Sequence, residues 1–288
     1  MPPIVAVGEV LWDIDADGVE RLGGAPFNFV HHCRALGREA ILVSRVGRDE
    51  RGERIRAAMN RFDLSDEFLQ TDEEKPTGTV LVRKQPNGVN EYDIVADVAW
   101  DHLQWNDELD QLAHRAAAVY TGILAQRHMA ARMPIASWMF ARCCGPHVVD
   151  VNFRPPFHRN NLRFTLSMAT MVKFAEDELA TACETLGYDA PTLADQVAHL
   201  TPHDQGNGQL WITRGERGAE LWREGDDSPV VVPGVPATVV DTVGAGDAFC
   251  AAMLVKQLGG VPAAEALRFA VEYSAKVCEH AGAISTES

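Results

Sequence analysis

The chain has 288 residues, of which 46% are hydrophobic and 23% charged. These proportions are typical of a globular protein with a large core, and they exclude a disordered chain. The net charge of −15 at pH 7 opposes a phosphate backbone, so we expect no nucleic-acid partner. No stretch approaches the roughly 18 apolar residues of a membrane span, and we expect no membrane partner. The first ten residues, MPPIVAVGEV, predict a buried strand and lack the basic start of a signal peptide.

Short apolar runs alternate with amphipathic stretches along the chain. The apolar runs predict buried strands at Ile4–Gly8, Ala40–Val46, Ala118–Thr121, His147–Val151 and Leu210–Thr213. The amphipathic stretches predict helices at Ala25–Leu36, Glu50–Arg61, Arg127–Arg142, Glu176–Leu186, Thr192–Leu200, Ala245–Leu258 and Ala263–His280. The repeated order of strand, helix and strand predicts an α/β fold with a mainly parallel sheet and helices on both faces.

Two stretches break this rhythm. Leu11–Arg21 follows the first strand without a helix, and Gly78–Val95 contains two strand-like runs, Thr79–Lys84 and Asn90–Val95, joined by Pro86-Asn87-Gly88. Asn-Gly between alternating runs indicates a hairpin. We predict that both stretches form a small β appendage that could close over a site. A surface hairpin with no such role fits the local sequence equally well.

The six cysteines, Cys33, Cys143, Cys144, Cys183, Cys250 and Cys278, include no C-x-x-C pair. Several lie in apolar, helix-like surroundings. This pattern predicts buried free thiols in a reducing compartment, and therefore a cytoplasmic protein.

The motif with the clearest chemistry is DTVGAGDAF, residues 241–249. Small residues give way to an apolar helix-forming run, so Gly244, Ala245 and Gly246 can turn the backbone with its N–H groups inward at a helix start. Such a cradle suits a phosphoryl group in its transition state. Asp247 in the first helical turn could accept the proton of an attacking hydroxyl. The structural alternative is a glycine-rich turn in which Asp247 only caps the helix. The motif is not a Walker A loop, because no Gly-Lys-Ser/Thr follows, and Gly8-Glu9 lacks the dinucleotide fingerprint.

DTVGAGDAF closely resembles the C-terminal motif of the PfkB, or ribokinase-like, carbohydrate kinases. Within that family, the start of the chain is most similar to fructokinases. The resemblance covers nearly the whole chain in the family's order, through GEVLWD at 8–13, GGAPFN at 23–28, Leu36-Gly37, VGRDERG at 46–52, Thr77-Gly78-Thr79, DVNFR at 150–154 and TRGERG at 213–218.

The resemblance implies a fold, an activity and partners. The fold is a single ribokinase-like α/β domain over residues 1–288, with lid segments near 11–21 and 78–95. The activity is phosphorylation of a sugar hydroxyl by ATP, with Asp247 as catalytic base over the anion hole of Gly244–Gly246. The partners are a small-molecule sugar and ATP, and ATP implies Mg²⁺. A monovalent cation such as K⁺ near Asp241 is implied by resemblance alone. A lid hairpin could also form a homodimer seam, although nothing in the sequence requires it.

The resemblance also assigns individual residues. The implied sugar-binding residues are Asp13, Gly23, Gly24, Asn28, Asn152 and Arg154, and the implied nucleotide-binding residues are Lys173, Glu178, Thr213, Gly215 and Gly218. Carboxylate and amide groups suit a polyol, and residues just past a strand end lie where α/β proteins gather ligands. Each has a local alternative. Asp13 could be a turn residue, Asn28 an exposed helix residue and Arg154 half of a surface ion pair, while the glycines could serve turns or a hairpin.

Two positions depart from the family pattern. The family's Asn-x-x-Glu element, which helps organise Mg²⁺ and phosphates through water, has Ala175 in place of the Asn, whereas Glu178 matches. Glu176 or Asp177 could compensate. Val271 stands where many members have an Asn beside the adenine, which predicts more apolar packing there.

Two other functions therefore stay open: a nucleoside or other small-molecule kinase of the same family, and a degenerate, non-catalytic sugar- or nucleotide-binding protein. The local sequence does not select the sugar.

Overall fold

A computed structural model of the chain describes residues 1–84, 90–140, 145–154 and 159–284. Within these residues the strands form one sheet of nine strands and one of four. The nine-stranded sheet has the spatial order β13-β12-β11-β10-β9-β8-β1-β4-β5. In that order its strands are Val230–Val232, Ala219–Arg223, Gln209–Thr213, Met171–Ala175, His147–Asp150, Ala118–Gly122, Ile4–Val7, Ala40–Gly47 and Leu69–Asp72.

The neighbours from β11 to β5 pair in parallel, and β12 and β13 add an antiparallel edge. The central strand β1 explains the arrangement. Ile4 and Ala6 point into one core cluster, and Val5 and Val7 point into the other. A strand that is apolar on both sides needs cover on both faces, as parallel sheets have. The predicted α/β class with a mainly parallel sheet is confirmed.

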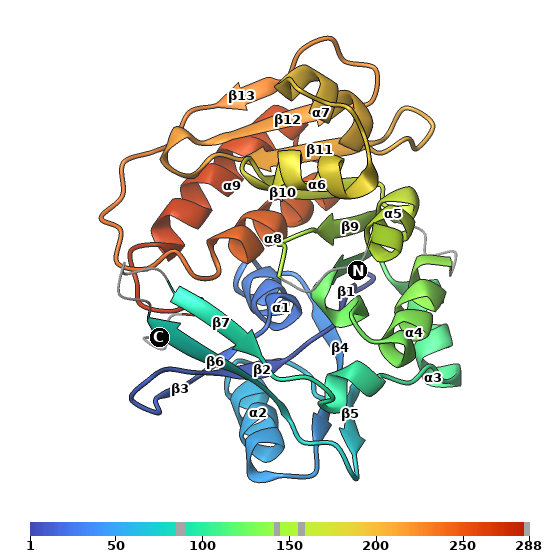
Figure 1. Cartoon of the computed structure of the whole chain (residues 1–288), viewed down its shortest axis with the longest axis vertical. Helices are drawn as coiled ribbons and strands as arrows, with labels where there is room; N and C mark the ends of the chain where they lie inside the picture. The colour runs from blue at the N-terminus through green and yellow to red at the C-terminus, as the bar shows by residue number, and fades with distance from the viewer. Residues whose placement is uncertain (85–89, 141–144, 155–158, 285–288) are drawn as a thin grey trace.

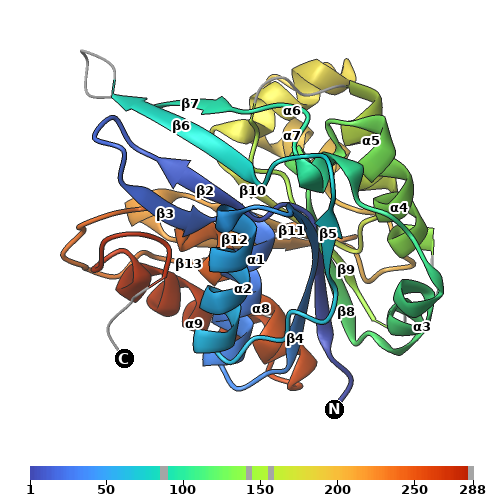
Figure 2. The ribbon, with the colours of Figure 1, turned by 90° about the horizontal axis from the view of Figure 1, so that it is seen from below.

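Helices cover both faces of the large sheet (Figures 1 and 2). One face carries α1 (Ala25–Ala35), α2 (Glu50–Arg61), α8 (Ala245–Leu258) and α9 (Ala263–Val277). The other carries α3 (Asp107–Arg115), α4 (Met129–Phe140), α5 (Arg159–Met168), α6 (Glu178–Leu186) and α7 (Leu193–Leu200). Short 3₁₀ turns lie at Ala99–His102 (η1), Leu124–Gln126 (η2) and Gly215–Arg217 (η3).

The small sheet has the order β3-β2-β6-β7, with bounds Glu20–Gly23, Leu11–Ile14, Gly78–Lys84 and Asn90–Ile94. Figure 2 shows it apart from the large sheet, at one side of the molecule. Its strands come from the two stretches that break the helix–strand rhythm. The predicted connection Pro86-Asn87-Gly88 lies outside the described residues. That the small sheet acts as a lid remains a proposal.

Several predicted boundaries differ from the structure by a few residues. Helix α6 begins at Glu178 because β10 extends to Ala175 and residues 176–177 form a turn. Helix α9 ends at Val277 and not at His280. Helix α4 begins at Met129 and not at Arg127, whose guanidinium instead donates to the carbonyl oxygens of residues 94 and 95. Its predicted end, Arg142, lies outside the described residues.

Among the described cysteines, Cys33, Cys183 and Cys250 are free and buried, and Cys278 is free and partly exposed. This matches the predicted thiols, while Cys143 and Cys144 lie outside the described residues. No helix in the described part of the chain is both long enough and apolar enough to cross a membrane.

Candidate active site

Asp247 lies in the first turn of α8, and its side chain is buried. Gly244 caps this helix in the left-handed conformation, at φ 79°. A side chain there would also collide with Ala283, so the position requires glycine. The turn therefore places the N-terminus of α8, with the positive end of its dipole, at the predicted anion hole. The Ala245 N–H there donates a long hydrogen bond to the Thr242 carbonyl oxygen, at 3.3 Å.

Asn28 of α1 holds the Asp247 carboxylate. Its Nδ2 donates a hydrogen bond to Asp247 Oδ2 at 2.8 Å. Asn28 is only 5% exposed, so the alternative of an exposed helix residue is wrong. Its Oδ1 is buried without a hydrogen-bond partner in the described structure. An unpaired buried acceptor is costly, and a ligand hydroxyl would satisfy it.

Burial first, and then the negative charge of Asp150, raise the pKa of Asp247, which lies at about 7. The hydrogen bond from Asn28 and the positive charge of Lys173 act in the opposite direction. A carboxylate whose pKa lies near neutrality can both take up and release a proton at physiological pH. A carboxylate that only capped the helix would not need a pKa near neutrality.

Lys173 lies beneath the anion hole and forms an ion pair with Asp150. Asp150 ends β9, Lys173 is its register partner on β10, and the Nζ–Oδ1 distance is 3.1 Å. A Cβ at Gly246 would stand 3.1 Å from the Lys173 Nζ, so the ammonium lies directly against the turn. Sequence reasoning assigned Lys173 to the nucleotide and gave Asp150 no separate role. The register of β9 and β10 is what pairs them.

Among the predicted sugar-binding residues, Asp13 lies on β2 of the small sheet, so it is a strand residue and not a turn residue. A Cβ at Gly23 would lie 2.5 Å from Asp13 Oδ2, which explains a glycine at that position. Burial raises the pKa of Asp13 to about 6, and the charges of Arg154 and Arg21 lower it. The structure therefore brings Asp13 and Arg154 into one electrostatic environment. The Arg154 guanidinium also lies 5.6 Å from the Tyr92 ring centroid.

Glu9 is a buried acid at this site that sequence reasoning quoted but left without a role. It follows β1, and its carboxylate accepts a hydrogen bond from the backbone N–H of Ala25 at the start of α1. Its Oε2 is buried without a partner in the described structure, and burial raises its pKa to about 7. A Cβ at Gly24 would lie 2.7 Å from the Glu9 carbonyl oxygen, so Gly24 permits this close packing.

Glu178, a predicted nucleotide-binding residue, connects the segments that follow β9 and end β10. Its carboxylate accepts hydrogen bonds from the backbone N–H groups of Phe153, at 2.7 Å, and Ala175, at 2.8 Å. Burial raises its pKa. Between β9 and Phe153, Asn152 adopts φ 37°, an uncommon value for a residue with a side chain. Glu178 thus fixes the loop that carries both Asn152 and Arg154.

The predicted nucleotide turn follows β11. Thr213 ends the strand, and Gly215 and Gly218 both have positive φ, at 57° and 92°. Next to this turn, Glu176 forms ion pairs with Arg214 and Arg217. Glu176 is therefore already engaged and is not a free substitute for the missing amide at Ala175.

Two further predicted residues flank α8 in the chain: Asp241 precedes it, and Val271 lies on the following helix, α9. The Asp241 carboxylate accepts backbone hydrogen bonds from Val243, at 3.0 Å, and Gly282, at 2.9 Å. Val271 of α9 is buried in the core shared by α1, α8 and α9. An adenine contact at Val271 and a cation at Asp241 stay predictions. In the part of the chain that is described, no group of three or more His, Cys, Asp or Glu side chains is arranged to hold a metal ion.

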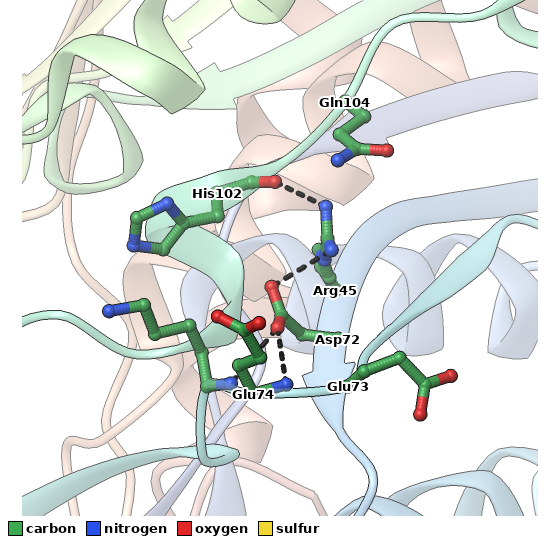
Figure 3. Close-up of a pocket in the computed structure, with 7 residues that line it drawn as sticks. Arg45, Asp72, Glu73, Glu74, His102 and Gln104 are labelled. Carbon is green, nitrogen blue, oxygen red and sulfur yellow. Dashed lines mark hydrogen bonds and ion pairs between the residues drawn. The ribbon is translucent and has the colours of Figure 1, made fainter.

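A cavity of about 310 Å³ lies elsewhere, between β4, β5 and η1 (Figure 3). None of the predicted site residues lines it. The Arg45 guanidinium donates to the His102 carbonyl oxygen and pairs with Asp72 at 2.9 Å. The cavity borders the start of the connection from β5 to the small sheet, through Glu73, Glu74 and Lys75, and Asp247 is not among its lining residues. Its lining consists of Arg45, Asp72, Glu73, Glu74, Lys75, His102 and Gln104.

Comparisons with known proteins identify the family and the fold of the chain. The sequence profile described as "pfkB family carbohydrate kinase" matches residues 8–288. A fructokinase of Klebsiella pneumoniae is 27% identical over 87% of this chain and 83% of its own length. A crystal structure of an uncharacterized sugar kinase from Pyrococcus horikoshii superposes with a TM-score of 0.83 at 25% identity, covering 97% of this chain and 93% of that one. A fructokinase from Xylella fastidiosa with bound ATP superposes at 0.83 and 21% identity, over 98% and 93% of the two chains. The fold is the ribokinase-like α/β fold.

Proposed function

The chain belongs to the pfkB family of carbohydrate kinases, and from that premise we propose that it moves the γ-phosphoryl group of ATP onto a hydroxyl of a small, fructose-like sugar. The observation that carries the proposal is Asp247, buried at the N-terminus of α8, bonded to Asn28, and with a pKa raised to about 7. A carboxylate in that position can accept a hydroxyl proton.

In the proposed reaction the sugar hydroxyl oxygen forms a bond to the γ-phosphorus. The bond from that phosphorus to the β,γ-bridging oxygen breaks, and ADP leaves with the electron pair. The hydroxyl proton passes to Asp247. The backbone N–H groups at Gly244, Ala245 and Gly246 stabilise the charge that spreads over the equatorial oxygens. Catalysis then rests on positioning and charge stabilisation, for which the buried and hydrogen-bonded site is suited.

We propose that the sugar lies between the small sheet and α1. Support comes from Asp13 on β2, from the unpaired Asn28 Oδ1, and from the Arg154 charge acting on Asp13. Asn152 and Arg154 follow β9 at the edge where parallel sheets bind ligands. The glycines at 23 and 24 allow the backbone to approach the sugar closely. The small sheet would then act as the lid.

The nucleotide is proposed to lie along α8, Thr213, Gly215 and Gly218, with Glu178 nearer the phosphates and Lys173 beneath the turn that holds them. Mg²⁺ fits as an ion that arrives with ATP, because it keeps several waters and needs only one or two carboxylates beside the phosphates. Glu178 is the carboxylate that suits this role: each oxygen accepts one backbone N–H and keeps a further lone pair. When bound, the ion neutralises phosphate charge. The proposal also includes a K⁺ ion near Asp241, a cytoplasmic location and a homodimer.

Two other functions give different outcomes in one experiment. The test is a panel of sugars and nucleosides with ATP and Mg²⁺, in which ADP formation is measured for the wild type and for Asp247→Asn. Fructose-dependent ADP release that is lost in the variant supports the proposal. Nucleoside-dependent release would make the chain a nucleoside kinase of the same family. Absence of release with every acceptor, despite ATP and sugar binding measured by calorimetry, would make it a non-catalytic binding protein.

A further inference from the structure

The ion pair between Asp150 and Lys173 is almost completely withdrawn from water, with side chains 1% and 7% exposed. Such a pair loses the hydration of both charges, so its net contribution to folding is small or unfavourable compared with an apolar pair. Stability alone therefore does not account for two charges at this place. Their position relative to the catalytic turn offers another reason.

The pair contacts the catalytic turn from the sheet side. The Lys173 ammonium lies against Gly246, as the close approach of its Nζ to that residue shows. The other Asp150 oxygen faces the Tyr120 hydroxyl at 3.5 Å and the Cys250 thiol at 3.9 Å. Cys250 is one helical turn after Gly246. The pair thus touches the first two turns of α8 from beneath, through Gly246 on one side and Cys250 on the other.

The charged and titratable groups around Asp247 come from several elements. Glu9 follows β1, Tyr120 is on β8, Asp150 on β9, Lys173 on β10 and Cys250 on α8 itself. Helix α1 contributes the neutral amide of Asn28. On α9, which packs along α8, the titratable Tyr273 hydroxyl is engaged with the ring of His32. Asp150 and Lys173 therefore act on Asp247 with charges of opposite sign, and Glu9 acts with the same sign as Asp150.

We propose that Asp150 and Lys173 are positioning residues of the reaction, which fix the first turns of α8 from beneath and set the charge balance in which Asp247 accepts its proton. This rests on the proposed function of Asp247 as the base. The pair acts through the α8 turn and through the electrostatic environment of the base. It contacts neither of the proposed substrates directly.

The test uses Asp150→Asn and Lys173→Met, each of which removes one charge at nearly constant volume. The Asp247 carboxyl is titrated by NMR in protein labelled with ¹³C at aspartate Cγ, and its signal is identified by its loss in Asp247→Asn. Removal of the negative charge should move the Asp247 midpoint to lower pH, and removal of the positive charge should move it to higher pH, each by about one pH unit. The acid limb of kcat/KM for the sugar should move in the same directions.

A matched control is another buried ion pair, Arg45–Asp72, whose side chains are 11% and 7% exposed. It lies at the cavity of Figure 3, away from Asp247. Asp72→Asn should lower stability and leave the Asp247 midpoint unchanged. If either single variant of the catalytic pair fails to fold, the double variant Asp150→Asn/Lys173→Met, which leaves no unpaired buried charge, takes its place. Its midpoint should differ from wild type by less than about half a unit, because the two effects oppose each other.

The proposal would be overturned if the Asp247 titration midpoint were unchanged in both single variants, or if it shifted in the same direction in both. A shift of a full pH unit in the double variant would overturn it as well. The NMR titration needs no turnover. A wild-type protein that releases no ADP with any acceptor therefore contradicts the proposed function while the charge balance is still measured, so the two failures are distinguishable.

Discussion

The Asn28 amide donates to Asp247 Oδ2 at 2.8 Å, although the two residues are 219 positions apart in the chain. This bond joins α1, which also begins at the proposed sugar-binding glycines, to α8, which carries the proposed anion hole. It orients the Asp247 carboxylate through one oxygen and leaves the other oxygen outside the bond. In the proposed function, sugar binding and proton transfer would be coupled through Asn28, because a hydroxyl that pairs with its Oδ1 would also lie near Asp247.

Asp247→Asn preserves the shape of the side chain and removes the proton acceptor. We expect turnover to fall by roughly 10²–10⁴, the range of a positioned general base, while ATP still binds. Steady-state kinetics measure the rate, and calorimetry measures ATP binding. Turnover close to that of the wild type would show that Asp247 is not the base.

The same variant should be more stable than the wild type at alkaline pH. Because the pKa of Asp247 is raised to about 7 in the folded protein from 3.8, the folded state favours the protonated acid. Wild-type stability therefore falls between about pH 4 and pH 7 and levels off above pH 7. The amide that replaces the carboxyl in the variant cannot ionise, so its advantage should grow over that window to roughly 2–4 kcal/mol at pH 8. Urea unfolding at pH 5 and pH 8 measures it, and an advantage that does not grow with pH contradicts the raised pKa.

Asp13→Ala should raise the KM for the sugar and leave the KM for ATP unchanged. A hydrogen bond to a charged group contributes about 1.5–3 kcal/mol, so we expect the sugar KM to rise at least about tenfold. Asp15→Ala is the matched control. It removes an exposed carboxylate of the same hairpin, paired with Arg21 at 2.9 Å, and should change the sugar KM by less than about twofold. A change confined to ATP would remove Asp13 from the sugar site.

Ala175→Asn restores the amide of the family pattern and should lower the Mg²⁺ concentration needed for half the maximal rate. The shift should be on the order of tenfold at most, because Mg²⁺ is held largely through its waters. Glu176 is paired with Arg214 and Arg217, so it is not free to replace the amide, and Asp177 stays the alternative. Ala175→Leu adds similar bulk without a donor and serves as the control. Superimposable Mg²⁺ titrations of wild type and Ala175→Asn would exclude a role for this position in metal use.

The large elements could be predicted from the sequence because their signals are local. The bounds of α2 and α8 follow from apolar periodicity and from breakers at their ends, and both agree with the structure. The strand β10 was missed. Its central Lys173 interrupts the apolar run, and the Lys173 ammonium forms its ion pair with Asp150 on the neighbouring strand, which the local sequence does not show. The strands β5, β12 and β13 were missed as well. In β5 and β12 polar residues lie beside the apolar ones, whereas β13 is only three residues long.

Some site residues could likewise be predicted from local sequence, whereas others depend on contacts between distant elements. The nine residues DTVGAGDAF contain both the helix start and its carboxylate, so the sequence alone predicted Asp247 in the first turn of α8. The burial of Glu9 and the orphaned oxygen of Asn28 depend on how β1, α1 and α8 meet. No local pattern contains that information. Individual site assignments beyond the motif are accordingly proposals that the variants above can test.

The packing of Ala283 against Gly244 makes the turn that begins α8 depend on a segment that lies beyond α9 in the chain. The Gly282 N–H donates to Asp241, and the Ala283 carbonyl oxygen contacts the ring of His32 on α1. A polypeptide that ended before residue 282 would lack these contacts with both α1 and the α8 turn, and the proposed anion hole would lose its support from behind.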